Sequence, residues 1–199
     1  MPKNESTQSD AIPSVIYGKA NDNNLGVYPL KMDNITLALT TIDYAHHEIH
    51  AGDHFACNSY IAVARNSAKQ IAIITPNTTT YSHLFIDIDV TAGELLYVMT
   101  EDATISANGT ACTVVNNNRN LTKTSGTLVF INPTATAGST VLIQKYFGAT
   151  KSNGGGSSRN EMEIILKANT KYLLTFTEQN IADCKVNYIL EWYDHTNNI

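Results

Sequence analysis

The 199-residue sequence predicts an all-β fold, either an antiparallel β-sandwich or a jelly-roll-like single domain with an extended N-terminal arm. Three observations predict it. Apolar and polar residues alternate with a period of two, Gly- and Asn-containing turns separate short segments, and long segments with a period of 3.6 are missing. Hydrophobic residues make up 43% of the chain and charged residues only 16%, so a core can form beneath a weakly charged surface.

Residues 1–30 are predicted to form the arm, and residues 31–199 the β-sandwich domain. The arm is polar, is punctuated by prolines and contains the run 21–24 (NDNN). Such a segment cannot bury enough apolar surface by itself, so we expect it either to be disordered or to be ordered by a partner. The arm residues expected to contact a partner or a neighbouring subunit are Ile12, Val15, Tyr17, Val27 and Tyr28.

Period-two patterns after residue 30 predict a series of short strands. They fall at 35–40, 60–64, 71–74, 84–90, 94–100, 112–115, 127–131, 141–147, 161–167, 172–177 and 186–193. A turn at Ala92-Gly93 predicts that 84–90 and 94–100 form a hairpin. The Gly-rich segment 152–158 is predicted to be a flexible loop, with a second set of partner or subunit contacts at Asn153, Gly154, Gly155 and Gly156.

Charge and targeting signals narrow the possible partners. The net charge of −5 argues against binding to nucleic acid or to an anionic membrane, since both need a basic patch. No apolar run reaches the roughly 18 residues that a spanning helix needs, and the first residues do not form a signal peptide.

The three cysteines, Cys57, Cys112 and Cys184, are therefore expected as buried thiols made in a reducing cytoplasm, with neither a disulfide framework nor a zinc site.

The densest group of chemically active side chains lies at 46–54 (HHEIHAGDH). On a strand, His46, Glu48 and His50 would share one face and could bind a metal ion. A simpler interpretation is a strand that leads into a turn at Gly52, with its histidines half-exposed or hydrogen-bonded. A third interpretation is an interface that responds to pH, because clustered histidines gain charge below about pH 6.5. The spacing is not that of a helical HExxH site, so no metal and no cofactor is the main expectation.

Other candidates for catalysis are weak, and we predict that the chain is not an enzyme. A GxSxG nucleophile motif is missing, and the glycines at 154–156 lack the Lys-Ser/Thr of a phosphate-binding loop. The carboxylate pairs Asp87/Asp89 and Glu101/Asp102 fit a solvent face better than a glycosidase site. Four aromatic residues could form either a sugar-stacking platform or part of the core: Tyr172, Tyr188, Trp192 and Tyr193.

Several segments, in their order and spacing, resemble a family of tailed-phage virion proteins encoded beside the major capsid protein, the decoration or auxiliary capsid proteins. They cover most of the chain between residues 45 and 196. They are 47–52 (HEIHAG) followed by Phe55, 74–79 (ITPNTT) with Ser82 and His83, 116–120 (NNNRN), 152–156 (SNGGG), 163–167 (EIILK), 169–172 (NTKY) and 191–196 (EWYDHT).

The resemblance implies a non-enzymatic decoration, or cement, protein that binds the outside of the capsid and reinforces contacts between capsomers. Its expected partner is the major capsid protein, and it is expected to self-associate as a trimer or, second, a dimer. It would be assembled in the host bacterial cytoplasm and reside on the virion. The alternative is a β module associated with a head or tail fibre that binds host surface glycans, which exposed aromatic side chains along a shallow groove would favour.

Overall fold

The computed structural model describes residues 17–19, 27–29, 44–148, 156–159, 163–179 and 182–196. The chain divides into two units, residues 1–43 and 44–199. In the first unit, β1 (Tyr17–Lys19) pairs antiparallel with β2 (Val27–Pro29). The predicted strand at 35–40 and the predicted contact residues Ile12 and Val15 lie outside the described residues, and an arm boundary after residue 30 stays a prediction.

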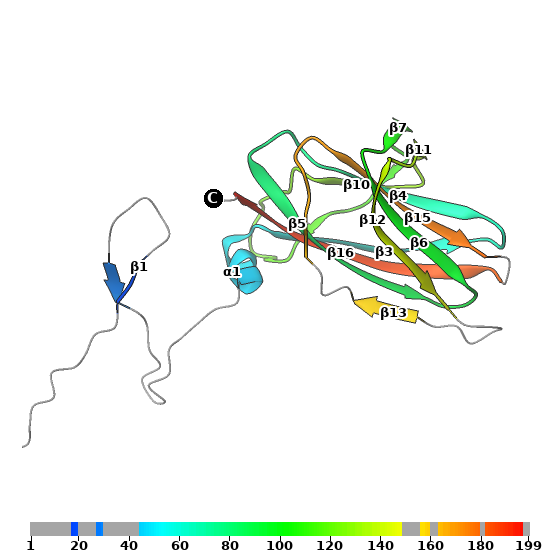
Figure 1. Ribbon diagram of the computed structural model, residues 1–199. Helices are drawn as coiled ribbons and strands as arrows, with labels where there is room; N and C mark the ends of the chain where they lie inside the picture. The colour runs from blue at the N-terminus through cyan, green and yellow to red at the C-terminus, as the bar shows by residue number, and fades with distance from the viewer. Residues whose placement is uncertain are drawn as a thin grey trace, which may run out of the picture. The chain divides into compact units, whose positions relative to one another are not determined.

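The second unit is a sandwich of two antiparallel sheets, as the sequence predicts (Figure 1). Sheet I contains, in spatial order, β13 (Gly156–Arg159), β5 (Thr80–Val90), β16 (Cys184–Thr196), β3 (His54–Val63) and β9 (Val115–Asn116). Sheet II contains β12 (Thr140–Phe147), β6 (Leu95–Glu101), β15 (Lys171–Glu178), β4 (Ala68–Ile74), β10 (Leu128–Ile131) and β8 (Thr110–Ala111).

The strand order is that of a jelly roll. The chain crosses between the sheets at each step from β3 to β6, continues in sheet II with β12, and then crosses again at each step through β13, β15 and β16. The order β13-β5-β16-β3 in one sheet therefore faces β12-β6-β15-β4 in the other, which is the double Greek key of a jelly roll.

The predicted hairpin between 84–90 and 94–100 is wrong, because β5 and β6 belong to opposite sheets. Both strands turn their apolar residues toward the same core, but from opposite sides. The connection therefore passes over the end of the sandwich instead of folding back within one sheet. It uses Gly93 at a φ of +75°, a conformation that favours glycine.

Strand β16 lies between β5 and β3 in sheet I, and its inward side chains lie in the middle of the core. It pairs with β5 over Val186–Thr196 and with β3 over Cys184–Tyr193. Its inward residues alternate with exposed ones along most of its length, and each buried apolar side chain contributes roughly 1.5–3 kcal/mol. The largest fully buried side chains of the sandwich are Trp192, Tyr172, Tyr188, Phe55 and Phe176.

A segment inserted between β6 and β12 closes one side of the sandwich. Within it, β7 (Thr104–Ala107) pairs with β11 (Thr134–Thr136), β8 and β10 extend sheet II beyond β4, and β9 extends sheet I beyond β3. A disulfide between Cys57 and Cys112 fastens this segment to β3, with a Cα–Cα distance of 6.5 Å. The expectation of three thiols is therefore wrong for two cysteines, while Cys184 is a buried thiol.

Two further predictions need correction in the second half of the chain. The loop predicted at 152–158 is shorter, because Gly156 and the two serines after it belong to β13, which pairs with β5. Of the strand predicted at 161–167, the structure describes residues 163–167, and within these only β14 (Ile164–Ile165) is a strand, a short partner of β5. Both elements attach to β5 because its outer edge in sheet I is otherwise open.

Reduction of the Cys57–Cys112 bond should destabilise the sandwich. The bond encloses a sequence separation of 55 residues, for which the loss of chain entropy in the unfolded state is worth about 4 kcal/mol. Urea unfolding with and without reductant measures the difference, and Cys184→Ala is the control whose response to reductant should match the wild type. Thiol titration of the unfolded, unreduced chain should find one reactive thiol; three would contradict the bond.

Candidate functional site

The segment that carries the clustered histidines is a helix and not the predicted strand. Helix α1 (Tyr44–Ala51) ends at Gly52, whose φ of +78° allows its N–H to bond the Ile49 carbonyl at 3.1 Å. The next N–H, of Asp53, bonds the Glu48 carbonyl at 2.9 Å. A glycine directly after the last turn, with a histidine in that turn, is the signal that could have predicted this helix end.

The helix separates the three predicted metal ligands. His46 and His50 lie one turn apart on the exposed face, with their Nε2 atoms 3.1 Å apart. Glu48 lies on the opposite side of the helix and is buried. A shared face for all three residues is therefore wrong, and the described part of the chain contains no group of three such side chains that could hold a metal ion.

Three aromatic rings cross the outer face of sheet I beside α1. The register places Tyr193 of β16 between His54 of β3 and His83 of β5. The ring of Tyr193 stacks on His83 at a centroid distance of 4.6 Å and on His54 at 6.4 Å. Glu163 Oε1 accepts from the Tyr193 hydroxyl and binds His83 Nδ1, each at 2.5 Å. This carboxylate thereby ties the segment before β14 to the sheet.

Burial determines the protonation of His54. Desolvation lowers the pKa of its imidazole, against the opposing effect of the Glu191 and Glu48 carboxylates. The Asn117 Nδ2 group lies 2.8 Å from His54 Nδ1 and donates to it, which requires an unprotonated nitrogen at that position. The ring is therefore held in its neutral form.

On the inner side of the same end, Asp194 organises a buried polar network. Its two oxygens accept from the Ser82 hydroxyl at 2.7 Å and the Ser125 hydroxyl at 2.8 Å. Ser125 Oγ also accepts from the Trp192 indole N–H at 2.9 Å. Burial raises the pKa of Asp194, and the two serine hydrogen bonds oppose that rise. The network joins β5, β16 and the inserted segment.

A polar hollow of about 360 Å³ opens beside this network. An ion pair between Lys123 and Asp53 stands on its rim, and Phe55 forms its apolar floor. Half of the other lining residues are threonines, from the β4–β5 loop, the start of β5 and the inserted segment: Thr78, Thr80 and Thr124. The hollow could accept a small polar group, such as a side chain of a docked protein.

Apart from 152–156, the segments that resemble the decoration proteins meet at this α1 end of the sandwich. The run 116–120 reaches the helix end, where Asn116 Nδ2 donates to the Gly52 carbonyl at 2.8 Å and Asn118 Nδ2 to the His50 carbonyl at 3.3 Å. Segments 163–167 and 191–196 meet through Glu163 and Tyr193. Residues far apart in the sequence thus share one region.

The β4–β5 loop joins the same end. Thr75 Oγ1 donates to the Lys167 carbonyl at 2.6 Å, and the Asn169 N–H donates to the Pro76 carbonyl at 2.9 Å. This links segment 74–79 to segments 163–167 and 169–172. Of the segment 152–156, only Gly156 falls within the described residues, as the first residue of β13.

Of the two interpretations of the four aromatic residues, the structure shows packing in the protein and not a sugar-stacking platform. The four aromatic side chains are at most 5% exposed, because they pack in the core or against the outer face of β5 and β3: Tyr172, Tyr188, Trp192 and Tyr193. The carboxylate of Glu101 is also buried, where it accepts from Lys167 Nζ at 2.5 Å and from the Tyr172 hydroxyl at 3.3 Å. Asp102 is exposed in a turn at a φ of +61°.

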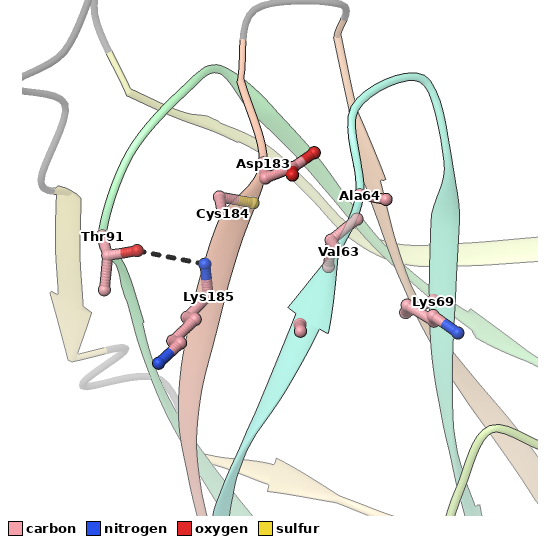
Figure 2. Close-up of a pocket in the computed structure, with 8 residues that line it drawn as sticks. Val63, Ala64, Lys69, Thr91, Asp183, Cys184 and Lys185 are labelled. Carbon is pink, nitrogen blue, oxygen red and sulfur yellow. Dashed lines mark hydrogen bonds between the residues drawn. The ribbon is translucent and has the colours of Figure 1, made fainter.

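A second hollow, of about 580 Å³, lies at the opposite end of the sandwich, where β3 ends and β16 begins (Figure 2). Its walls include Val63 and the buried thiol of Cys184, with Lys69 and Lys185 at the margin. Burial raises the pKa of the Cys184 thiol, and nearby acidic groups act in the same direction. A thiol kept protonated in this way is a poor nucleophile.

Comparison with known proteins adds no relative: no family model, curated protein or solved structure matches the chain. None of the helices in the described residues is long and apolar enough to cross a membrane. The residues of the chain are therefore the basis on which a function can be proposed.

Acidification should destabilise the protein through His54. Burial lowers the pKa of His54 in the folded state, so the unfolded chain binds more protons at this residue. The folded state therefore keeps its full stability above the ordinary imidazole pKa of about 6.5. It loses part of that stability as the pH falls through the lowered pKa of the folded state. We expect the wild-type urea midpoint to fall between about pH 7.5 and pH 5.5, and the midpoint of His54→Gln to fall less. His50→Gln, on the exposed side of α1, is the matched control and should behave as the wild type.

Proposed function

We propose that the chain is a non-enzymatic virion protein that decorates the outside of a tailed-phage capsid, with the major capsid protein as its partner. One observation carries the proposal. The segments that resemble the decoration proteins are scattered over the sequence from residue 47 to residue 196, yet those within the described residues, Gly156 excepted, converge on the α1 end. Likeness concentrated in one connected region favours a shared binding surface over general sandwich packing.

The properties of the α1 end suit docking to another protein. Its loops are held by buried hydrogen bonds to Asp194, Asn116 and Thr75, so little conformational entropy is lost when a partner binds. The groups that face solvent include amides, hydroxyls and imidazoles, together with four cations, one carboxylate and two apolar side chains: Arg119, Lys123, Lys167, Lys171, Glu163, Leu121 and Ile165. Such a surface forms many hydrogen bonds without strong repulsion from a capsid of either charge.

A repeating lattice makes modest contacts sufficient. Many copies that self-associate, as trimers or dimers, would bind adjacent capsomers with a combined strength far above that of one contact. The outer strands β12 and β13 offer sheet edges to which an extended segment of a neighbour can add. We assign that role to the 1–30 segment, with the contact residues predicted from the sequence, from Ile12 to Tyr28.

The glycan-binding alternative has lost its support from the aromatic residues. The four side chains considered for stacking on a sugar ring are buried, namely Tyr172, Tyr188, Trp192 and Tyr193, whereas the exposed tyrosines in the described part of the chain, Tyr60 and Tyr146, lie on strands of different sheets. Glu101 is likewise occupied by its bonds to Lys167 and Tyr172 and serves to hold the β14–β15 connection. We therefore favour the decoration role over both a lectin-like and a hydrolytic one.

Cosedimentation with undecorated capsids tests the proposal. The wild-type chain should bind saturably, and a chain that lacks residues 1–30 should bind more weakly. Charge reversal at the α1 end, by Arg119→Glu, should weaken binding by about tenfold, or ~1.4 kcal/mol. Arg65→Glu makes the same change on an exposed arginine at the opposite end and should leave binding unchanged.

The outcomes separate the parts of the proposal. If the wild-type chain does not bind capsids at all, the decoration role is wrong. If Arg65→Glu weakens binding and Arg119→Glu does not, the protein docks through the other end. Equal binding of the shortened and full chains would remove the arm from the interface.

A further inference from the structure

The exposed face of α1 presents two imidazoles in a chelating arrangement. His46 and His50 are four residues apart, which places them on the same helix face. Their Nε2 atoms are 3.1 Å apart, their ring centroids 4.8 Å apart, and the ring planes are inclined at 76°. Both side chains belong to exposed residues, so a solute ion can reach them.

We propose that His46 and His50 form a binding site for a late first-row divalent metal ion, such as Cu²⁺, Ni²⁺ or Zn²⁺. Imidazole nitrogens bind these ions at about 2.0–2.1 Å. Two nitrogens 3.1 Å apart, each at that distance from one ion, subtend an angle of about 100° at the metal. That angle lies between those of square-planar and tetrahedral centres, so the two rings need little movement to bind the same ion.

The end of the helix is braced in a way that preserves this pair. The His50 carbonyl accepts from Asn118 Nδ2 at 3.3 Å, and the following Gly52 carbonyl accepts from Asn116 Nδ2 at 2.8 Å. The last turn is also closed by the N–H of Gly52 on the Ile49 carbonyl. A short helix held at its C-terminal end keeps the two imidazoles in register before the metal arrives.

The site is a two-ligand site and not the three-ligand set that a strand would have formed. Glu48 is buried on the far side of α1, and His47 lies beside it with Nδ1 3.2 Å from a Glu48 oxygen. The remaining coordination positions are filled by water or by donor groups of another molecule. A metal ion held on a chelating resin also keeps some coordination positions open, and the two imidazoles can fill them. We therefore expect such a resin to retain the protein.

Two measurements on the full chain, purified without an affinity tag, test the site. Titration calorimetry with CuCl₂, NiCl₂ and ZnCl₂ should show one site per chain, tightest for Cu²⁺, whereas MgCl₂ should give no binding. The wild type should also be retained on immobilised Ni²⁺ and be released by imidazole. His46→Ala and His50→Ala should each weaken metal affinity by about tenfold or more and abolish retention.

His47→Ala is the matched control, since it removes an exposed imidazole from the same helix without touching the pair; it should bind metal as the wild type does. Far-ultraviolet circular dichroism of each variant checks that the fold is kept. The proposal is overturned if the wild type binds none of the three ions, or if the His46 and His50 variants keep its affinity. Loss of binding in His47→Ala would overturn it as well. It does not depend on capsid binding, so either result can stand without the other.

Discussion

The structure depends on the pairing of β16 with two neighbours at once. This strand of 13 residues hydrogen-bonds to β5 along one edge and to β3 along the other, and its inward side chains fill the middle of the core. A central strand of that length cannot shift its register by one residue, since Trp192 and Leu190 would then face solvent. The same register places Tyr193 between His54 and His83 on the outer face. The core and the α1 end are therefore fixed by one set of backbone pairings.

The inserted segment between β6 and β12 converts an open sandwich into one that is closed on one side. It adds β9 to sheet I and β10 to sheet II, and the Cys57–Cys112 bond joins it to β3. It also supplies Ser125 to the Asp194 network and Asn116 to the end of α1. Buried polar groups of this kind are costly unless each has a partner. The α1 end is consequently a set of mutually dependent loops, which explains why segments distant in the sequence are connected there.

The class of fold could be predicted from the sequence, but the connections between the two sheets could not. Alternation is a local signal, so the strands that contain Ile86, Tyr172 and Tyr188 could be predicted from neighbours alone. After the strand that contains Leu84 and Val90, the chain can either return to the same sheet or pass to the other one. Contacts far along the chain decide between the two, which is why the hairpin prediction failed. Helix α1 was missed because eight residues with three histidines have little amphipathic pattern. The disulfide could not be predicted because it joins β3 to the inserted segment, across 55 residues.

The disulfide and the proposed place of assembly can be reconciled through the fold. Disulfides persist in oxidising surroundings, whereas assembly in a bacterial cytoplasm takes place in reducing ones. The pairing of β3 with β9 and β16 fixes the position of Cys57, and the Cys112 N–H bonds the Val129 carbonyl at 2.8 Å. Backbone hydrogen bonds therefore hold the two cysteines near each other whether or not the bond has formed. Under the proposed decoration role, the jelly roll would fold with thiols and gain the cross-link after release from the cell, where it would add stability on the virion surface.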